Sequence, residues 1–226
     1  MQNIPRKCLY ERRKQSHANL ILNVVIVLFF FLLVGELIFN SVYTNIYVKG
    51  KSMMPTLIGA PSDSGSLVFE GGDYVFVNTR ATADYSDIVV VKTVDSHGVT
   101  YNIIKRVVAF GGDTVKIEKG QLWIKFKGES EFTKINEPYV AEENNNPSEY
   151  INNFEEHVVE EGCMFLLGDN RDVSEDSRRR GDYPVASLVG VVPRWSIKYK
   201  STITSIYTFF DFDLGFAKKG GTFYSY

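Results

Sequence analysis

The chain has 226 residues, of which 44% are hydrophobic, and a formal net charge of −2 at pH 7. This length suits one membrane-anchored domain or two small ones. Residues 1–18 carry five Lys and Arg against one Glu, a net charge of +4, so the rest of the chain carries −6. A basic tail on an acidic body argues against a nucleic-acid-binding protein, whose basic patch should lie on its folded domain.

Residues 20–39 form a continuous apolar segment, in which only Asn23 and Glu36 are strongly polar. A helix of about 20 residues, rising about 1.5 Å per residue, reaches across the roughly 30 Å hydrocarbon core of a membrane. A cleaved signal peptide would be shorter and would end in a small-x-small site. A buried globular helix is the alternative, because the segment is apolar all round. We therefore expect a transmembrane helix at 19–40.

The basic residues precede the apolar segment. The positive-inside rule then predicts that the tail, residues 1–18, stays in the cytoplasm and that the body lies outside. Cys8 and Cys163 flank the segment, so a membrane would keep them apart, and neither has a C-x-x-C partner or a metal-ligand cluster around it. We expect Cys8 to be a free thiol in the tail, Cys163 to be a small core residue, and no metal to be bound.

After residue 40 the apolar pattern becomes short and alternating, which predicts a mostly β body. The expected strands are residues 74–78, 88–92, 99–108, 164–167, 186–193 and 196–200, with a hairpin at 114–118 and 122–126. Residues 59–73 are expected to form a loop.

Residues 129–161 hold ten acidic residues and one lysine, which is typical of a solvated insertion with at most one short helix. An acidic binding face is the alternative. The aromatic tail at 201–226 is too polar and too short to span a membrane, so we expect it to pack on the body or lie at the membrane surface. Three isolated histidines are expected at the surface: His17, His97 and His157.

Ser52 is a candidate nucleophile in residues 48–57, although a serine near a glycine is more often a turn residue. Lys105 lies in an apolar strand pattern and shares a face with Ile103 and Val107. On such a face the amine loses hydration, which lowers its pKa and lets it take the proton of a serine. An edge-strand lysine that reaches water is the alternative.

Four blocks of sequence carry a family resemblance. They are GKSMMPTL at 50–57, GDYVFV at 72–77, the stretch 105–113 that begins KRVV and ends Gly-Gly-Asp, and GDNRDVSEDSR at 168–178. In this order they resemble the boxes of bacterial type I signal peptidases, membrane-bound Ser-Lys enzymes that remove signal peptides from exported proteins. With the anchor, the resemblance covers about residues 20–200, and the first and last blocks are the most specific.

The resemblance implies Ser52 as nucleophile, Lys105 as general base and Ser174 as the group that orients the lysine by a hydrogen bond. It implies that ion pairs hold the last block, made by Asp169, Asp176 and Arg178. It also implies small S1 and S3 pockets, lined by Val48, Met53, Leu57, Ile103 and Ile104. A lysine at 105, where eukaryotic relatives have a histidine, implies the bacterial class.

The implied fold is a transmembrane helix followed by an antiparallel β core at 41–113 and 163–200, related to that of LexA-like repressors, with a small cap inserted at 114–162. The implied activity is cleavage of signal peptides from exported preproteins through an acyl-enzyme, without a cofactor. The implied substrates have small residues at −1 and −3 of the cut. The implied location is the cytoplasmic membrane, single-pass, with the N-terminus inside.

Two alternatives come from other classes. One is a non-catalytic membrane-tethered assembly factor, such as a pilus-assembly accessory, which the intact Ser52 and Lys105 disfavour. The other is a self-cleaving repressor, which the anchor and the lack of a helix-turn-helix pattern disfavour.

The chain also departs from the family pattern. Gly111 replaces a usual proline, so a looser turn is expected there. Ser86 stands where a glycine is common, and Gly50 stands where some relatives carry a serine. The short insertion, and the absence of a cysteine pair that some relatives carry, indicate the smaller, single-anchor, Gram-positive type.

Overall fold

The computed structural model describes residues 6–61, 71–95, 97–209 and 222–224, of which 6–16, 18 and 222–224 are described by their main chain alone. It separates two compact units, Met1–Val42 and Tyr43–Tyr226. The start of the basic tail, most of the loop at 59–73, residues 210–221 of the aromatic tail and the side chain of Cys8 lie outside the described residues.

The first unit is the helix α1 (Arg6–Val42). Its portion Asn19–Val42 has a mean hydropathy of 2.8 and is long and apolar enough to cross a membrane, and no other helix in the described ranges is. The predicted segment at 19–40 lies within it. The helix begins at Arg6, so the basic residues that follow are helical as well.

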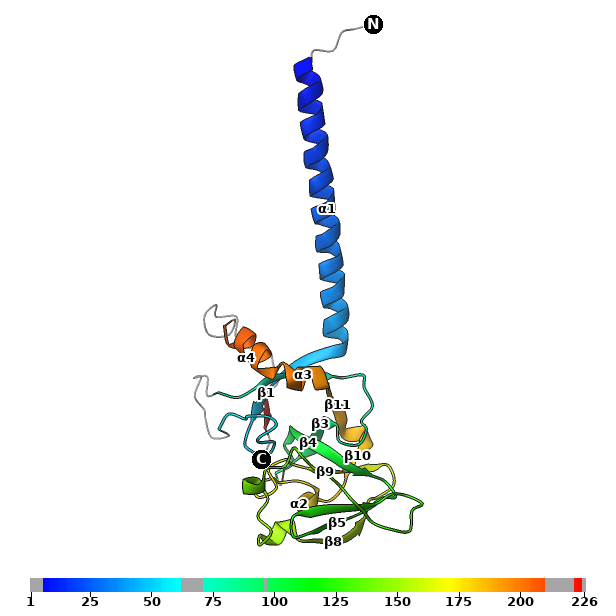
Figure 1. Cartoon of the computed structure of the whole chain (residues 1–226). Helices are drawn as coiled ribbons and strands as arrows, with labels where there is room; N and C mark the ends of the chain where they lie inside the picture. Colours follow the sequence, from blue (N-terminus) through cyan, green and yellow to red (C-terminus); the bar gives the residue numbers. More distant parts are fainter. Residues whose placement is uncertain (1–5, 62–70, 96, 210–221, 225–226) are drawn as a thin grey trace. The chain divides into compact units, whose positions relative to one another are not determined.

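The second unit contains two β-sheets (Figure 1). The larger sheet has the order β10-β9-β4-β3-β11-β2-β1-β12, and all its neighbouring strands are antiparallel except β1 and β12, which are parallel. Its strands are β1 (Tyr43–Lys49), β2 (Tyr74–Asn78), β3 (Ile88–Val94), β4 (Thr100–Phe110), β9 (Cys163–Leu167), β10 (Tyr183–Pro184), β11 (Leu188–Val192) and β12 (Thr222–Tyr224). The predicted antiparallel β body is confirmed.

The smaller sheet has the order β7-β6-β5-β8. Its strands are β5 (Thr114–Glu118), β6 (Gln121–Lys125), β7 (Thr133–Lys134) and β8 (Phe154–Val158), with the short 3-10 helices η1 (Glu142–Asn144) and η2 (Tyr150–Asn152) between β7 and β8. Val115 and Leu122 of this sheet share one buried cluster with Ala109 of β4 and Phe165 of β9. The inserted segment is therefore joined to the larger sheet through a common hydrophobic core.

Strand β4 is covered on both faces. Ile104 packs in one apolar cluster with β1 and β2, whereas Ile103 packs in another with β9. Neighbouring residues of a strand point to opposite faces, so this strand has no solvent face along most of its length. Lys105, in the middle of β4, is consequently fully buried.

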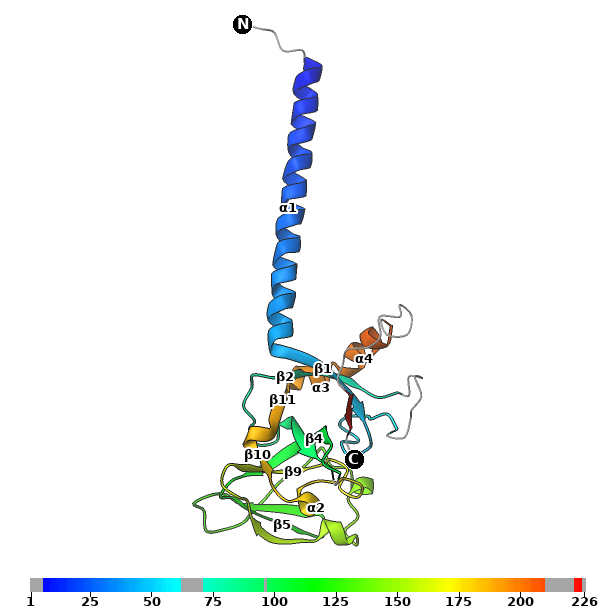
Figure 2. The same cartoon turned by 180° about the vertical axis from the view of Figure 1, so that it is seen from behind.

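The predicted strand at 196–200 is wrong, because this region is helical: α3 (Arg194–Lys198) and α4 (Lys200–Thr208) follow β11. Pro193 ends β11 and stands at the N-cap of α3, where its missing N–H costs nothing. Helix α4 packs on β2 (Figure 2). Tyr207 of α4 stacks on Tyr74 of β2, with 5.1 Å between their ring centroids. The described part of the aromatic tail therefore packs on the body.

The first residues of the predicted strand at 186–193 are also not strand, because the 3-10 helix η3 (Val185–Ser187) precedes β11. The turn at Gly111 is not loose: its N–H, which a proline would lack, donates to the carbonyl of Cys163 at 3.0 Å.

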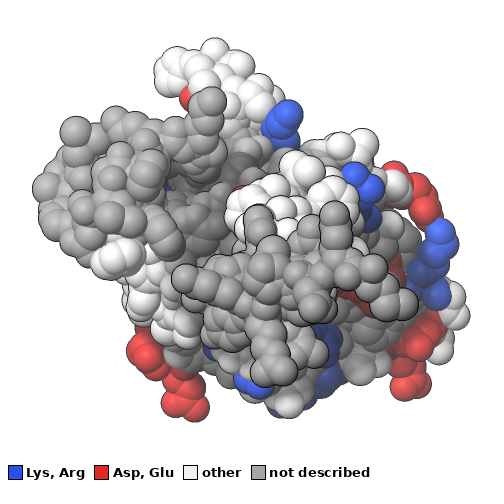
Figure 3. All heavy atoms as spheres, turned by 90° about the horizontal axis from the view of Figure 1, so that it is seen from above, with Lys and Arg blue, Asp and Glu red and all other residues white. Residues whose placement is uncertain are grey.

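Charged side chains of both signs stand along the margin of the face in Figure 3.

His17 and His97 are exposed, as predicted. The prediction for His157 is wrong, because it is half-buried and its Nε2 lies 2.9 Å from Oδ1 of Asp182. The two residues are 25 positions apart, beyond the reach of a local sequence pattern.

Candidate active site

Ser52 and Lys105 meet in the interior of the second unit. The Oγ of Ser52 lies 2.8 Å from Nζ of Lys105, although the two residues are 53 positions apart. Ser52 is 1% exposed and Lys105 is 0% exposed. Nζ also donates to the carbonyl oxygen of Ile104 at 3.1 Å, which fixes the direction of the amine. A hydroxyl and an amine at this distance can exchange a proton directly.

Burial lowers the pKa of Lys105 from 10.5 to about 8, because the charged amine has lost its hydration. The carboxylates of Asp176 and Asp169 act in the opposite direction and favour the charged form. The net effect leaves a substantial neutral fraction at slightly alkaline pH. A neutral amine is the form that can accept the proton of Ser52.

Two glycines shape the loop that carries Ser52. Gly50 has a φ of 78°, in the left-handed region that favours glycine. A β carbon at Gly59 would come to 1.8 Å from the carbonyl oxygen of Gly50, so the chain can cross there only without a side chain. The N–H of Gly50 donates to the carbonyl of Ala60 at 2.7 Å and closes the loop.

The loop at 168–178 lies against the main chain of Ser52. The N–H of Asn170 donates to the carbonyl oxygen of Ser52 at 2.9 Å. Asp176 accepts from the N–H of Gly168 at 3.0 Å and pairs with Arg178 at 2.8 Å. Burial alone would raise the pKa of the Asp176 carboxyl, but the charge and hydrogen bonds of Arg178 outweigh it and lower that pKa. This ion pair at the start of α2 (Ser177–Arg180) therefore stays charged.

Two further ion pairs tie this loop to other elements, and the sequence prediction missed Arg106 in the first pair and both partners of the second. Asp169 binds Arg106 through two hydrogen bonds of 2.8 and 2.6 Å, and the guanidinium carbon of Arg106 lies 3.8 Å from the ring centroid of Tyr139. Arg171 pairs with Glu137, and both side chains are nearly inaccessible. Arg106 could have been suspected from the sequence because it stands beside Lys105. Glu137 could not, because it lies in a stretch that was expected to be solvated.

Lys200 is a further residue that the sequence prediction missed. Its Nζ lies 2.7 Å from Oδ2 of Asp73 and donates to the carbonyl of Thr56 at 2.9 Å. Oδ2 of Asp73 also accepts from the N–H of Ile58 at 2.7 Å. These contacts hold the segment just after Ser52 against β2 and α4.

Ser174 is buried, and a hydrogen bond from its hydroxyl helps to lower the pKa of the Asp176 carboxyl, while none joins its Oγ to Nζ of Lys105. The hydrogen bond to Lys105 that the sequence predicted is therefore not formed in this structure.

The predicted pocket residues fall into two groups. Four of them belong to the apolar cluster beside the Ser52 loop: Val48, Met53, Leu57 and Ile104. Ile103 packs instead with Met164 and Tyr183, in a cluster on the other face of β4. The structure therefore does not bring Ile103 together with the other four.

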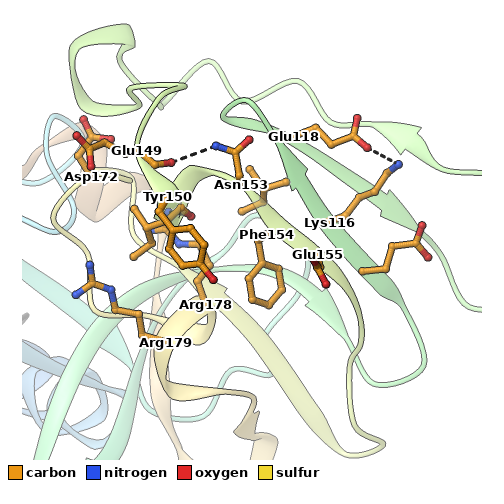
Figure 4. A pocket seen from close by; sticks show the side chains of 13 residues that line it. Lys116, Glu118, Glu149, Tyr150, Asn153, Phe154, Glu155, Asp172, Arg178 and Arg179 are labelled. Carbon is orange, nitrogen blue, oxygen red and sulfur yellow. Dashed lines mark hydrogen bonds and ion pairs between the residues drawn. The ribbon is translucent and has the colours of Figure 1, made fainter.

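A separate hollow of about 980 Å³ lies over β5, η2 and β8 (Figure 4). Neither Ser52 nor Lys105 lines it, whereas Arg178 and Arg179 do. Within it Lys116 pairs with Glu118 at 2.8 Å. In the part of the chain that the structure describes, no group of three or more His, Cys, Asp or Glu side chains could hold a metal ion.

Comparison with known proteins identifies the family of the chain. A profile of the family described as "Signal peptidase, peptidase S26" matches residues 20–196. The chain belongs to this family. It is therefore a hydrolase of the serine protease class. Membership of this family implies that it cleaves signal peptides from exported preproteins. Its apolar helix α1 corresponds to the membrane anchor of the family.

Relatives of the chain include bacterial signal peptidases and chloroplast processing peptidases of Arabidopsis thaliana. The chain is 31% identical to signal peptidase I S of Bacillus subtilis (strain 168) over 151 residues, which cover 63% of this chain and 70% of the relative. It is 28% identical to signal peptidase I of Bacillus amyloliquefaciens over 173 residues, with 74% and 83% covered. A solved signal peptidase I from Enterococcus faecalis V583 is 27% identical, covers 50% of this chain and 98% of its own, and has a TM-score of 0.39.

Proposed function

We propose that this signal peptidase works through a Ser-Lys dyad, with Ser52 as nucleophile and Lys105 as general base. The observation that carries the proposal is the 2.8 Å contact between Nζ of Lys105 and Oγ of Ser52 at a buried position. The lowered pKa of Lys105, about 8, supports it, because the base must be neutral before it acts.

In the first step, Nζ of Lys105 takes the proton of Ser52 while Oγ attacks the carbonyl carbon of the scissile peptide bond. The resulting lysinium then gives this proton to the leaving amine, and the peptide bond breaks to leave an acyl-enzyme. In the second step, Lys105 takes a proton from a water molecule, whose oxygen attacks the ester. The bond between Oγ of Ser52 and the carbonyl carbon then breaks, Oγ takes the proton back from Lys105, and the free enzyme is regenerated.

The oxyanion of each tetrahedral intermediate needs hydrogen-bond donors that are already aimed at it. Gly50 has no side chain to donate, so we assign this role to the N–H of Ser52 and to a second donor that is another main-chain group or water. The positive φ of Gly50 sets the direction of the main chain just before Ser52.

Ser174 is proposed to orient Lys105 once Ser52 is acylated, when the amine no longer shares a proton with Oγ. The pairs made by Asp169, Asp176 and Arg178 are proposed to hold the surrounding loop. The apolar cluster of Val48, Met53, Leu57 and Ile104 supports a preference for small residues at −1 and −3 of the cut, whereas Ile103 lies on the other face of β4 and is not assigned to it.

We further propose that α1 spans the cytoplasmic membrane with the basic N-terminus inside and the catalytic unit outside. The basic residues before the apolar segment support this orientation. Preproteins emerging across the membrane would then meet the site on the side where their signal peptides are released. An inserted cap at 114–162 is part of this proposed organisation.

The test is cleavage of a preprotein by the full-length enzyme in detergent. Ser52→Ala and Lys105→Arg should each lower kcat/KM by about a thousandfold or more, because the first removes the nucleophile and the second replaces the base by a guanidinium that stays protonated. Lys92→Arg, at an exposed position of β3, is the matched control and should retain full activity. Activity in either site variant would exclude that residue from its assigned role.

A further inference from the structure

The last described strand of the chain lies on the edge of β1. Strand β12 runs parallel to β1, with Tyr47 opposite Thr222 and Lys49 opposite Tyr224. It also packs against β4. Strand β1 leads into the loop of Ser52, and β4 carries Lys105, so this segment contacts both strands that supply the dyad (Figure 1).

The main-chain groups of β1 show why this edge accepts a strand. The N–H of Val48 donates to Asp73 at 2.9 Å and its carbonyl accepts from Ala60 at 3.1 Å, both on the side of β2. Successive residues of a strand direct these groups to alternate sides, so those of Tyr47 and Lys49 point toward β12. This is the edge that an incoming extended peptide would have to pair with in order to advance toward Ser52.

We propose that β12 is an internal competitor of the substrate: the chain's own C-terminal segment occupies the edge of β1 and must leave before a preprotein can pair there. This inference rests on the proposed function, because it assumes that the substrate reaches Ser52 as an extended strand. The parallel direction of β12 supports it, since β12 advances along β1 toward the Ser52 loop.

The effect of such a competitor is on binding rather than on chemistry. When only a fraction of the enzyme has a free edge, the apparent KM rises by the inverse of that fraction, while kcat at saturating substrate stays the same. A tethered segment acts at an effective concentration of the order of millimolar, so even weak pairing holds the edge closed for much of the time.

The first test is Phe223→Pro, which removes the N–H of the middle residue of β12 and so weakens its pairing. Full-length enzyme with a preprotein substrate should show a KM at least threefold lower than wild type, with unchanged kcat. Ala217→Pro, in the same tail but outside β12, is the control and should behave as wild type. A synthetic peptide of residues 218–226 should inhibit the Phe223→Pro enzyme competitively, and a scrambled peptide should not.

The second test closes the edge permanently. Adjacent strands lie about 4.8 Å apart, within the Cα separation of a disulfide, so Lys49→Cys with Tyr224→Cys should cross-link on oxidation. Oxidised enzyme should lose at least nine-tenths of its activity and regain it on reduction, whereas Lys49→Cys alone should be insensitive to oxidant.

The outcomes separate the two proposals. If wild type cleaves a preprotein and Ser52→Ala does not, the proposed function holds. An unchanged KM in Phe223→Pro, or a cross-linked enzyme with full activity, would then overturn the competitor alone. If Ser52→Ala retains activity, the dyad fails before the tail is considered.

Discussion

Gly168 lies directly against Ser52. A β carbon built on Gly168 would come to 2.5 Å from the carbonyl oxygen of Ser52 and to 2.2 Å from Oγ of Ser174. Main-chain oxygen cannot move away cheaply, because the same carbonyl accepts the hydrogen bond of Asn170. The position of the serine therefore depends on the absence of a side chain at 168.

Gly168→Ala should lower kcat by about tenfold to a hundredfold, because a displacement near 1 Å at a nucleophile has an effect of that order. Steady-state kinetics with a preprotein would measure it. Gly35→Ala is the matched control, since a β carbon there has nothing within 4 Å, and it should leave kcat unchanged. Wild-type kcat in Gly168→Ala would show that the loop adjusts without moving the serine.

The rate should follow the protonation of Lys105. Since the pKa of this amine is lowered to about 8, kcat/KM should rise with pH as the amine becomes neutral and level off above that value. A pH–rate profile between pH 6 and pH 10, at constant ionic strength, would measure the midpoint. A profile that is flat through pH 8 would contradict the assignment of Lys105 as base.

The same lowered pKa is a cost to stability. Between about 8 and 10.5 the unfolded chain binds more protons at Lys105 than the folded chain, so the free energy of unfolding rises with pH there and the full cost is present below 8. Lys105→Met removes that cost. It should raise the stability at pH 7 by about 2–3 kcal/mol, and this gain should shrink toward pH 10.5.

Denaturant titrations of wild type and Lys105→Met at the two pH values would measure this difference. Lys92→Met provides the control for loss of an exposed lysine. A gain that is equal at both pH values would come from packing and not from the charge of the amine.

Substitution of Gly50 should be costly because of its φ of 78°. A side chain in this region of φ adds about 1–2 kcal/mol of strain, so Gly50→Ala and Gly50→Ser should both lower the melting temperature and the activity. If the hydroxyl of serine adds an oxyanion donor, Gly50→Ser should keep a higher kcat than Gly50→Ala. Equal and undiminished kcat in both variants would remove residue 50 from the oxyanion site.

Ser86 has a φ of 67°, so the position where a glycine is common in the family keeps glycine-like geometry here. Its main chain is held on both sides, by the carbonyl of Val107 at 2.9 Å and the guanidinium of Arg106 at 2.7 Å. Ser86→Gly should therefore relieve strain and raise stability by about 0.5–1 kcal/mol, after the entropy of glycine is subtracted. Thermal unfolding would measure it, with Ser86→Ala expected to give no gain.

The chemistry of the site was readable from the sequence because it is concentrated in short blocks. Ser52 and Lys105 each stand in a block of distinctive residues, and the apolar neighbours of Lys105 predicted that it is buried. The alternation of side chains along a strand could also have corrected the pocket assignment. Ile103 and Ile104 are neighbours in a strand, so they cannot both face one pocket.

The network of ion pairs around Ser52 and Lys105 could not be predicted from the sequence. Glu137 reaches Arg171 across 34 positions, and nothing local distinguishes it from the solvated glutamates beside it. The helices after Pro193 were mistaken for a strand because five residues are too few to separate a period of 2 from one of 3.6. Strand β12 has three residues, and its pairing is decided by the edge it meets rather than by its own pattern.

Lys105 and Arg106 are neighbours on β4, and this adjacency makes catalysis depend on strand alignment. A slip of one residue would exchange their faces and bring to Ser52 a guanidinium, which cannot accept a proton. It would also separate Arg106 from Asp169, leaving a buried carboxylate without its two hydrogen bonds. A misaligned copy of this protease would thus be inactive rather than unspecific.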